Sequence, residues 1–434
     1  MNMWKTSRQK WFILPVLCWF AMWSFLELDP AENLNVSPRE KALLTQVSFG
    51  LFYQEIPRKP LAAQDLVTFK DQDLKQVDKQ IPLNQALEIQ SLIYHEDGRP
   101  LFKLRDGGYL LASRSLVYDH HLLKTETFDS QFWLEPGAQF YKEAPSAQTK
   151  PIQVSYKPYQ QVRIVGKLSY PRSQFGLTDK GEYVAWSSLS QEDNRIQRVQ
   201  EILEQKYKED GVGVYVKQLT TNQVAGVKAD LPMYSASITK LPYLYYVQQQ
   251  VLDGNLKWTD NYAYTKETED YDGAYDPAGT GSLPKEPTGQ KYSLKELVEK
   301  AAKESDNVAH NMLGYYGTDS SNATFHQAIR KIVGQTWDVV DREVTPEMAG
   351  LLMEAIYLQK GELLEMLKQT QFDDQRIPKE LPIPVAHKIG DADAFHHDAS
   401  IVFTKSPYVL VVFTENKDNN LISHISKDIY EVLK

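Results

Sequence analysis

The order of helix and strand patterns over residues 191–434 constrains the fold more than any other feature of this 434-residue chain. Residues 191–210 have the spacing of a charged amphipathic helix, and residues 212–219 alternate as a strand does. Mainly helical segments follow, and then strands are predicted over 401–404 and 408–414 and a last helix over 421–433. Strands at both ends with helices between them predict an α+β domain, in which one sheet is built from both ends around an all-helical insert.

Three short motifs lie within this domain in positions where reactive side chains could meet. Ser237 and Lys240 are three residues apart at the start of a predicted helix, which places both side chains on one face, and an amine there can activate a hydroxyl. Ser305-Asp306-Asn307 follows a helix that begins with a capping box at residues 293–296. Lys388-Ile389-Gly390 precedes the C-terminal strands.

Ser-x-x-Lys, Ser-Asp-Asn and a lysine-glycine motif in this order, 68 and 83 residues apart, resemble the motifs of penicillin-binding proteins and class A β-lactamases. The resemblance covers residues 191–434 and implies their fold, an antiparallel sheet with a helical insert. It also implies the catalytic roles. Ser237 is the nucleophile, Lys240 its proton acceptor, Ser305 a proton shuttle to the leaving nitrogen, and Lys388 a source of positive potential.

The same resemblance implies the substrate-binding residues. Asn307 would hold the substrate amide, and Gly390 would lie on the strand that flanks the substrate. The backbone N–H groups of Ser237 and Asp391 would form the oxyanion hole. No metal and no cofactor is implied.

Two departures from the family pattern bear on activity. Ile389 stands where the family usually has threonine, so a hydroxyl that binds the substrate carboxylate is missing. Only residues 337–344 separate the preceding helix from Thr345, so the Ω-loop that carries the deacylating glutamate of class A β-lactamases is short. Glu343 has Glu347 instead of asparagine four residues later. We therefore interpret Glu343 as a solvated acid beside a helix, and we expect an acyl-enzyme to persist.

Two further clusters have residue types that occur in ligand sites. His387, His396, His397 and Asp398 crowd the third motif, but their spacing fits no standard metal site, which favours a supporting or substrate-contact role for one of them. The glycine-rich residues 276–282 follow no strand, so we predict a loop that lines the cleft and no phosphate site.

The N-terminal half is predicted to be modular. Residues 1–28 form a cytoplasmic tip and a membrane segment, 29–81 a stalk, and 82–130 and 131–190 two small all-β units. Residues 104–116 align without gaps on residues 177–189, and this repeat resembles the closing strands of bacterial SH3-like domains. The resemblance implies cell-wall binding, and a rigid spacer is the alternative.

The N-terminus predicts the location of the protein. Lys5, Arg8 and Lys10 precede residues 11–26, an uncharged and apolar run with the character of an export signal, interpreted as an uncleaved anchor. The remainder would lie outside the membrane. The only cysteine, Cys18, lies in this run, and a net charge of −9 makes nucleic acid an unlikely partner.

These features predict a membrane-anchored, extracytoplasmic serine hydrolase. It would form an acyl-enzyme at Ser237 with an amide or ester of the cell envelope, such as a D-alanyl peptide stem of peptidoglycan. A true β-lactamase is one alternative. A wall-binding scaffold with an impaired hydrolase domain is the other.

Overall fold

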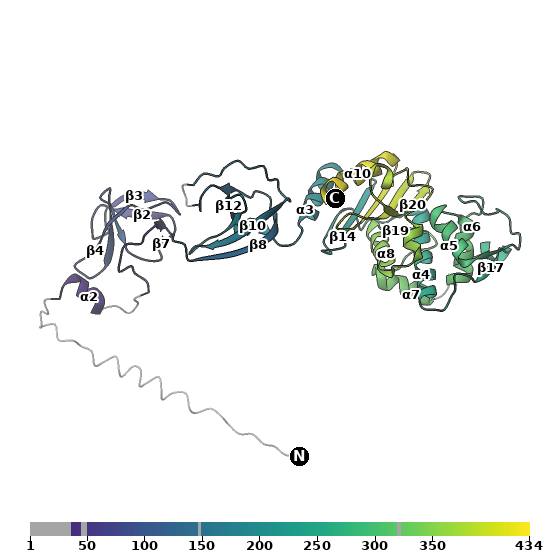
Figure 1. The fold of residues 1–434 in the computed structure, drawn as a ribbon, viewed down its shortest axis with the longest axis horizontal. Coiled ribbons are helices and arrows are strands. Elements are labelled where there is room, and N and C mark those ends of the chain that lie inside the picture. The colour runs from purple at the N-terminus through teal and green to yellow at the C-terminus, as the bar shows by residue number, and fades with distance from the viewer. Residues whose placement is uncertain (1–35, 45–49, 146–148, 319–322) are drawn as a thin grey trace, which may run out of the picture. The chain divides into compact units, whose positions relative to one another are not determined.

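A computed structural model describes residues 36–44, 50–145, 149–318 and 323–434 of the chain (Figure 1). The chain divides into two compact units. The first comprises Met1–Glu126, Tyr141–Ile152 and Lys167–Phe175, and the second comprises Thr127–Phe140, Gln153–Gly166 and Gly176–Lys434. The predicted membrane segment, residues 11–26, lies outside the described residues. Within the described ranges, no helix has the length and apolarity that a bilayer crossing requires.

The first sheet has five strands in the order β3-β2-β6-β5-β4. Their bounds are Leu66–Phe69 (β2), Val77–Ile81 (β3), Ile89–Tyr94 (β4), Pro100–Leu104 (β5) and Tyr109–Leu111 (β6). Helix α2 (Pro38–Leu44) precedes it, and β1 (Pro60–Ala62) pairs with β7 (Val117–Asp119). The prediction of a stalk over residues 29–81 is therefore wrong for β1, β2 and β3. The sequence shows no apolar alternation over β3, because four of its five residues are exposed.

A six-stranded sheet follows, in the order β13-β8-β10-β11-β12-β9. Its strands are Lys124–Leu134 (β8), Phe140–Tyr141 (β9), Gln161–Ser169 (β10), Gln174–Thr178 (β11), Tyr183–Ala185 (β12) and Leu189–Ser190 (β13). The two copies of the sequence repeat lie in equivalent hairpins, β5–β6 and β11–β12. Gly107 and Gly181 both take a positive φ at the hairpin turn, and each donates its N–H to the carbonyl three residues earlier. The resemblance to SH3-like domains remains a prediction.

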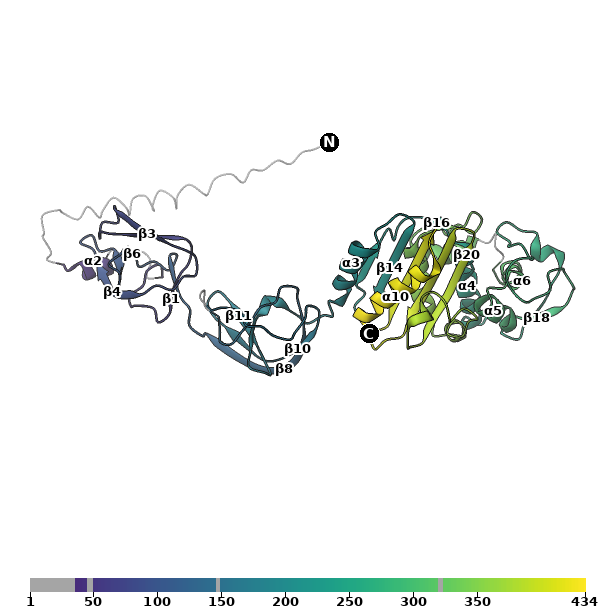
Figure 2. The same ribbon diagram turned by 90° about the horizontal axis from the view of Figure 1, so that it is seen from above.

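The predicted sheet with a helical insert is confirmed in the second unit. Its five strands are β14 (Val212–Gln218), β15 (Val224–Val227), β20 (Val385–Ala392), β21 (Phe395–Val402) and β22 (Tyr408–Glu415). They form an antiparallel sheet in the order β15-β14-β22-β21-β20. β14 therefore pairs with β22 although almost the whole helical insert separates them in sequence. Helices α3 (Arg195–Lys206) and α10 (Asn419–Leu433) begin and end this domain (Figure 2).

Alternation along the strands gives the sheet two buried faces. In β22, Tyr408, Leu410 and Val412 pack in a cluster with the apolar faces of α3 and α10. The intervening Val409, Val411 and Phe413 pack in a second cluster with the helical insert. A strand buried on both faces explains why residues 408–414 read as a continuous apolar run.

The helical insert holds α4 (Leu241–Leu252), α5 (Leu294–Lys303), α6 (Asn307–Met312), α7 (Ala323–Val333), α8 (Pro346–Gln359) and α9 (Glu362–Met366). A π-helix, Leu313–Thr318, continues α6. As the capping box predicted, the hydroxyl of Ser293 accepts the N–H of Glu296 at the start of α5. Thr345 caps α8 in the same way, through the N–H of Met348. Two short pairs complete the unit: β16 (Met233–Tyr234) with β19 (Glu343–Val344), and β17 (Asn261–Ala263) with β18 (Lys291–Ser293).

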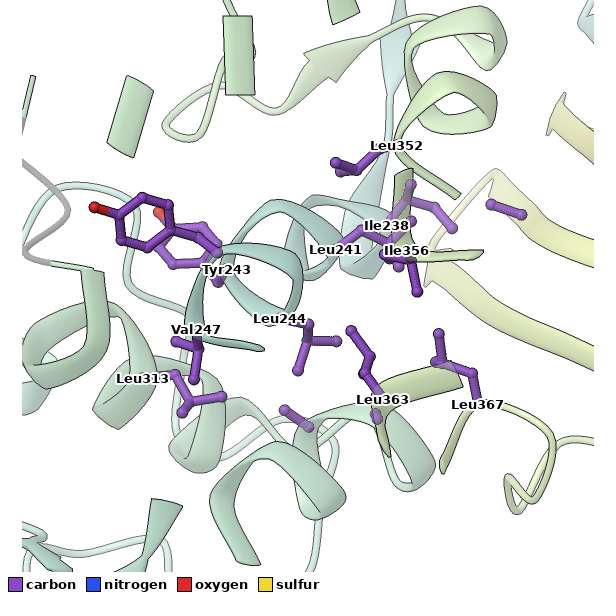
Figure 3. Packing of buried hydrophobic residues seen from close by; sticks show 14 of the residues in the cluster. Ile238, Leu241, Tyr243, Leu244, Val247, Leu313, Leu352, Ile356, Leu363 and Leu367 are labelled. Carbon is purple, nitrogen blue, oxygen red and sulfur yellow. The ribbon is translucent and has the colours of Figure 1, made fainter. Parts of the chain in front are cut away.

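Helix α4 lies in the middle of the insert and is anchored by its apolar side chains (Figure 3). Leu241 and Leu244 are fully buried, together with Ile238 just before the helix. They pack in one cluster with Leu352 and Ile356 of α8. Burial of apolar surface at about 25 cal/mol per Å² fixes the start of α4 and the turn before it. This is the turn that carries the Ser-x-x-Lys motif.

Candidate active site

Ser237 lies in a short 3-10 helix, Ala236–Lys240, that leads directly into α4, and its side chain is partly exposed. Ala236 has a φ of +48°, in the left-handed region that residues with a Cβ seldom adopt. Strain of this kind, about 1–3 kcal/mol, persists only where surrounding contacts hold it. The Tyr275 hydroxyl donates to the Ala236 carbonyl (2.8 Å), and the Ser235 N–H donates to the Arg342 carbonyl (2.8 Å). The turn that carries Ser237 is thus fixed from two sides.

Lys240 is fully buried beside Ser305 and Asn307. Its Nζ donates to the Ser305 carbonyl (2.5 Å) and to Oδ1 of Asn307 (2.6 Å), and it lies 3.4 Å from Oγ of Ser305. Burial lowers the pKa of Lys240 well below its usual value, and the charge of Lys388 lowers it further, while Asp306 opposes these effects. A lysine with a strongly lowered pKa can accept a proton from a neighbouring hydroxyl.

Ser305 stands between two amines. Its hydroxyl accepts a hydrogen bond from Nζ of Lys388 at 2.8 Å, and Lys240 lies on its other side. Ser305 itself has a φ of +56°, which places its side chain at the sharp turn between α5 and α6. Burial lowers the pKa of Lys388 to about 7, against the influence of the Asp398 carboxylate. Lys240, Ser305 and Lys388 therefore form a short path along which a proton can pass.

The glycine-rich loop packs against the second motif, as expected of a loop that lines the cleft. Nδ2 of Asn307 donates to the Asp276 carbonyl (2.8 Å), and its backbone N–H donates to the Thr280 carbonyl (2.9 Å). At Gly281, φ is +117° and a Cβ would lie 2.1 Å from Oδ2 of Asp306, so only glycine fits. The second amide proton of Asn307 is the one that could serve a substrate.

The third motif lies on β20, next to the nucleophile turn. A Cβ on Gly390 would lie 2.5 Å from the carbonyl oxygen of Ser235 and 2.9 Å from Cγ1 of Ile238, so glycine allows the strand to approach this closely. Asp391 follows on the same strand. Ile389 is 5% exposed, and its carbonyl accepts the second hydrogen bond of Lys388 (2.8 Å). The position that usually offers a hydroxyl is therefore apolar and buried.

Arg376 supports this strand from behind and was not predicted. It is 1% exposed, and its Nη1 donates to the carbonyls of Gly390 (3.0 Å) and His397 (2.7 Å), which joins β20 to β21. Nη2 lies 3.0 Å from Oδ1 of Asp391. Because Arg376 belongs to an irregular segment with no apolar period, the sequence held no signal for its burial.

His397 supports the nucleophile turn from β21. The Thr414 N–H donates to its Nδ1 (3.1 Å), so Nε2 carries the proton and donates to the Tyr234 carbonyl (2.8 Å). Burial lowers the pKa of His397 to about 4, which keeps this tautomer neutral. Of the histidines near the third motif, His397 therefore has the supporting role that was considered.

The other two histidines of the cluster are engaged elsewhere. His387 is fully buried and bonds to the carboxylates of Asp398 (3.0 Å) and Asp373 (3.2 Å). His396 pairs with Asp391 at the surface. In the described part of the chain, no group of three or more histidine, cysteine or acidic side chains could hold a metal ion.

The acid that raises the pKa of Lys240 is Asp306, and the acids of the connection between α7 and α8 have other surroundings. Asp338 accepts the N–H groups of Val340 and Asp341, and Asp341 is exposed. Glu343 lies in β19 opposite Tyr234, and its side chain is exposed. Nε1 of Trp337 donates to the Thr239 hydroxyl (3.2 Å), which ties the connection to the 3-10 helix. The residue of the connection that faces the site is Arg342, whose guanidinium carbon lies 3.8 Å from the centroid of the Tyr275 ring.

The structure thus gathers the residues singled out in the sequence at one end of the sheet. Hydrogen bonds join Lys240, Ser305, Asn307 and Lys388, while Ser237 lies on the turn beside them and Gly390 and Asp391 lie on the adjacent strand. Sequence reasoning missed Tyr275, Arg342 and Arg376. A hydroxyl beside a buried lysine, a relay hydroxyl and a second lysine are the components of a serine acyl-transfer site.

This fold and site define a serine hydrolase of the penicillin-recognising type. Residues 194–433 match the family model described as "Beta-lactamase enzyme family", which is more than half of the chain, so the protein belongs to this family. It is accordingly a β-lactamase-like serine hydrolase. No curated protein matches the chain.

The chain is also similar to solved structures of β-lactamases and of PBP-A. PBP-A is 19% identical over 55% of this chain and 96% of its own, with a TM-score of 0.46. The β-lactamase of Sphaerobacter thermophilus is 20% identical over 55% of this chain and 95% of its own, with a TM-score of 0.44. An ancestral class A β-lactamase is 18% identical over 55% of this chain and 99% of its own, also with a TM-score of 0.44.

Proposed function

We propose that the protein cleaves an amide or ester of the cell envelope, such as a D-alanyl peptide stem of peptidoglycan, through an acyl-enzyme at Ser237. The observation that carries this proposal is the buried path from Lys240 through Ser305 to Lys388, next to the strained turn of Ser237. These contacts support a role in acyl transfer, which needs a base, a relay hydroxyl and a source of positive potential close together. Lys240, Ser305 and Lys388 are buried and hydrogen-bonded, whereas surface residues would need no such contacts.

The first half-reaction that we propose uses these residues as follows. Oγ of Ser237 attacks the substrate carbonyl carbon while Nζ of Lys240 takes its proton. The N–H groups of Ser237 and Asp391 donate hydrogen bonds to the developing oxyanion. The proton then passes to Ser305, whose own hydroxyl proton goes to the leaving nitrogen or oxygen as the bond to the acyl carbon breaks.

The second half-reaction distinguishes a peptidase from a β-lactamase. Hydrolysis of an acyl-enzyme derived from a β-lactam requires a base that activates water. Of the acids in the α7–α8 connection, Asp341 and Glu343 are exposed, and Asp338 accepts the N–H groups of Val340 and Asp341 within its own turn. We therefore expect slow deacylation after reaction with a β-lactam. Family membership supports the alternative of a true β-lactamase, which steady-state hydrolysis of nitrocefin well above the background of Ser237→Ala would establish.

A third candidate is a wall-binding scaffold, favoured by the buried Ile389 at the position of a substrate-binding hydroxyl. In that case a cellular phenotype would survive Ser237→Ala and be lost when residues 82–189 are deleted. We place the protein outside the cytoplasmic membrane, anchored through residues 11–26. Release of a variant without residues 1–28 from the membrane fraction tests this location.

Labelling tests the acyl-enzyme directly. The chain beyond the anchor, residues 29–434, is incubated with a fluorescent penicillin or a fluorophosphonate, beside Ser237→Ala. Both probes are needed, because loss of the hydroxyl at Ile389 should weaken penicillins more than a probe without a carboxylate. Labelling of the wild type and not of Ser237→Ala supports the proposal. If neither probe labels the wild type, acylation at Ser237 is refuted.

A further inference from the structure

Arg342 joins the turn that carries Ser237 and Lys240 to the loop that precedes Tyr275. Its carbonyl accepts the Ser235 N–H at 2.8 Å, two residues before Ser237. Its guanidinium donates to the Tyr234 hydroxyl (3.2 Å) and to the carbonyls of Gly273 and Ala274 (3.2 Å each). A side chain with five N–H donors in a fixed plane is suited to hold several oxygens at once. The short α7–α8 connection therefore fixes the nucleophile turn to the loop that precedes Tyr275.

Tyr275 occupies the space between Arg342 and Lys240. Its ring centroid lies 3.8 Å from the guanidinium carbon of Arg342 and 4.6 Å from Nζ of Lys240. Asn311 holds its backbone through two hydrogen bonds of 2.8 Å, and its hydroxyl donates to the Ala236 carbonyl. The ring is 9% exposed, so it has little room to move.

We propose that Arg342 and Tyr275 are a positioning pair that holds Lys240 and the Ser237 turn ready for acylation and closes this side of the site to water. The inference deepens the proposed function and rests on it. Neither residue needs to touch the substrate. Both act through the groups that do.

The chemistry of the pair explains why it would prolong an acyl-enzyme. Hydrolysis of the ester needs a group that accepts a proton from water, and an arginine has no acceptor. Burial raises the pKa of Tyr275, so its hydroxyl stays protonated and remains a donor to Ala236. A water that approached Lys240 from the α7–α8 connection would meet a buried aromatic ring and a cation. Acylation is supported on this side of the site, and deacylation is not.

The charge of Arg342 adds an effect that pH can reveal. The groups that face Lys240 are Lys388 on β20, Asp306 and His310 at α6, Lys285 after the glycine-rich loop, Tyr275, and Arg342. Burial is the main cause of the low pKa of Lys240, and Arg342 lowers it further. If the charge at residue 342 is removed, the pKa of Lys240 should rise, so Lys240 becomes neutral only at higher pH.

The test compares Arg342→Gln, Arg342→Lys and Tyr275→Phe in the chain of residues 29–434. The rate constant of acylation by the fluorescent penicillin is measured from about pH 5.5 to pH 10, and the lifetime of the acyl-enzyme after free probe is removed. Arg330→Gln is the matched control, because Arg330 is exposed on α7 and its substitution makes the same change in net charge. A titration of ¹³C-labelled lysine reports Lys240 without any substrate.

Arg342→Gln should move the acid limb of acylation to higher pH by about half to one unit and shorten the acyl-enzyme lifetime several-fold. Arg342→Lys should show the acid limb of the wild type but the shortened acyl-enzyme lifetime of Arg342→Gln, because lysine keeps the charge and loses the planar contacts. Tyr275→Phe should slow acylation about tenfold without moving the limb, since it removes only the hydrogen bond to Ala236.

The inference is overturned if Arg342→Gln and Arg330→Gln share the pH profile and lifetime of the wild type. Should Arg342→Gln not fold, Arg342→Lys and Tyr275→Phe decide the question by the same two measurements. Failure of the proposed function looks different, because then the wild type itself is not labelled. A labelled wild type with an unlabelled Ser237→Ala leaves only the role of the pair to be judged.

Discussion

The two buried lysines of the site are suited to bind an incoming anion. Lys240 and Lys388 are at most 1% exposed, and within the described ranges neither forms an ion pair. Their acceptors are neutral oxygens of Ser305, Asn307 and Ile389. Burial without a counter-charge disfavours the protonated form, which lowers the pKa of both lysines. The potential that remains suits an oxyanion, or a substrate carboxylate deprived of its usual hydroxyl at Ile389.

His387 bonds to Asp398, the carboxylate that also raises the pKa of Lys388, and its protonation can be tested. Burial would lower the pKa of His387, but the carboxylates of Asp398 and Asp373 raise it to about 9. A folded-state pKa above the ordinary value of about 6.5 means that the proton stabilises the fold below pH 6.5, and that this contribution is lost as pH rises through about 9. His387→Gln should therefore lower the free energy of unfolding more at about pH 6 than at about pH 9.5.

Urea unfolding of the wild type and the variant at both pH values measures this effect. The difference between the two proteins is the informative quantity, because the low pKa of Lys388 gives the wild type an opposite trend above about pH 7. His424→Gln, an exposed position on α10, is the control. A loss of stability for His387→Gln that does not vary with pH would show that folding does not shift the pKa of His387.

At the scale of elements, local signals in the sequence predicted several helices and strands of the second unit. The capping box marked the start of α5, and the predicted strand over residues 408–414 corresponds to β22. These signals are local, because they arise from a helix end or from burial of a whole strand. They predicted elements next to Ser237 and Ser305, but the strand that carries Lys388, β20, was not predicted from a local pattern.

What could not be predicted depends on contacts between distant loops. Tyr275 and Arg342 lie in irregular segments, and each acquires its role from residues far away in sequence. Arg376 is buried by strands that pair only in the finished sheet. An isolated aromatic or arginine in a loop has no period and no cap, so its sequence does not distinguish it from a surface residue.

The fit between the glycine-rich loop and the turn before α6 can be tested with two glycines. Gly281→Ala would place a Cβ 2.1 Å from the Asp306 carboxylate, whereas Gly289 also has a positive φ but nothing within 4 Å. Gly289→Ala should cost only the backbone preference, about 1 kcal/mol. Gly281→Ala should cost more and slow acylation at least tenfold, because Asn307 follows Asp306 directly.

Probe labelling and urea unfolding of both variants give the comparison. Equal acylation rates in Gly281→Ala and Gly289→Ala would mean that the loop does not position Asn307. A difference in stability alone, with equal rates, would assign the loop a purely structural role.

At the scale of the whole molecule, each unit has a hydrophobic core of its own. The core of the first unit is formed by residues between Tyr53 and Val117, such as Phe102 and Leu110. Two hydrophobic clusters, one on each face of the five-stranded sheet β15-β14-β22-β21-β20, stabilise the second unit. They share no residue with the core of the first unit. Chains with separate cores commonly unfold in more than one step. The acyl-transfer site is built only from residues of the second unit.

The separate cores predict that a cavity in one unit lowers the melting temperature of that unit alone. Leu110 and Leu244 are at most 1% exposed, in the first and second units respectively, and replacement of a buried leucine by alanine costs about 2–5 kcal/mol. In scanning calorimetry, Leu110→Ala should lower one transition by several degrees and Leu244→Ala the other. Ser237 labelling should survive to an unchanged temperature in Leu110→Ala and be lost earlier in Leu244→Ala. A single transition that both substitutions lower equally would show that the two units fold as one, and that the first stabilises the site.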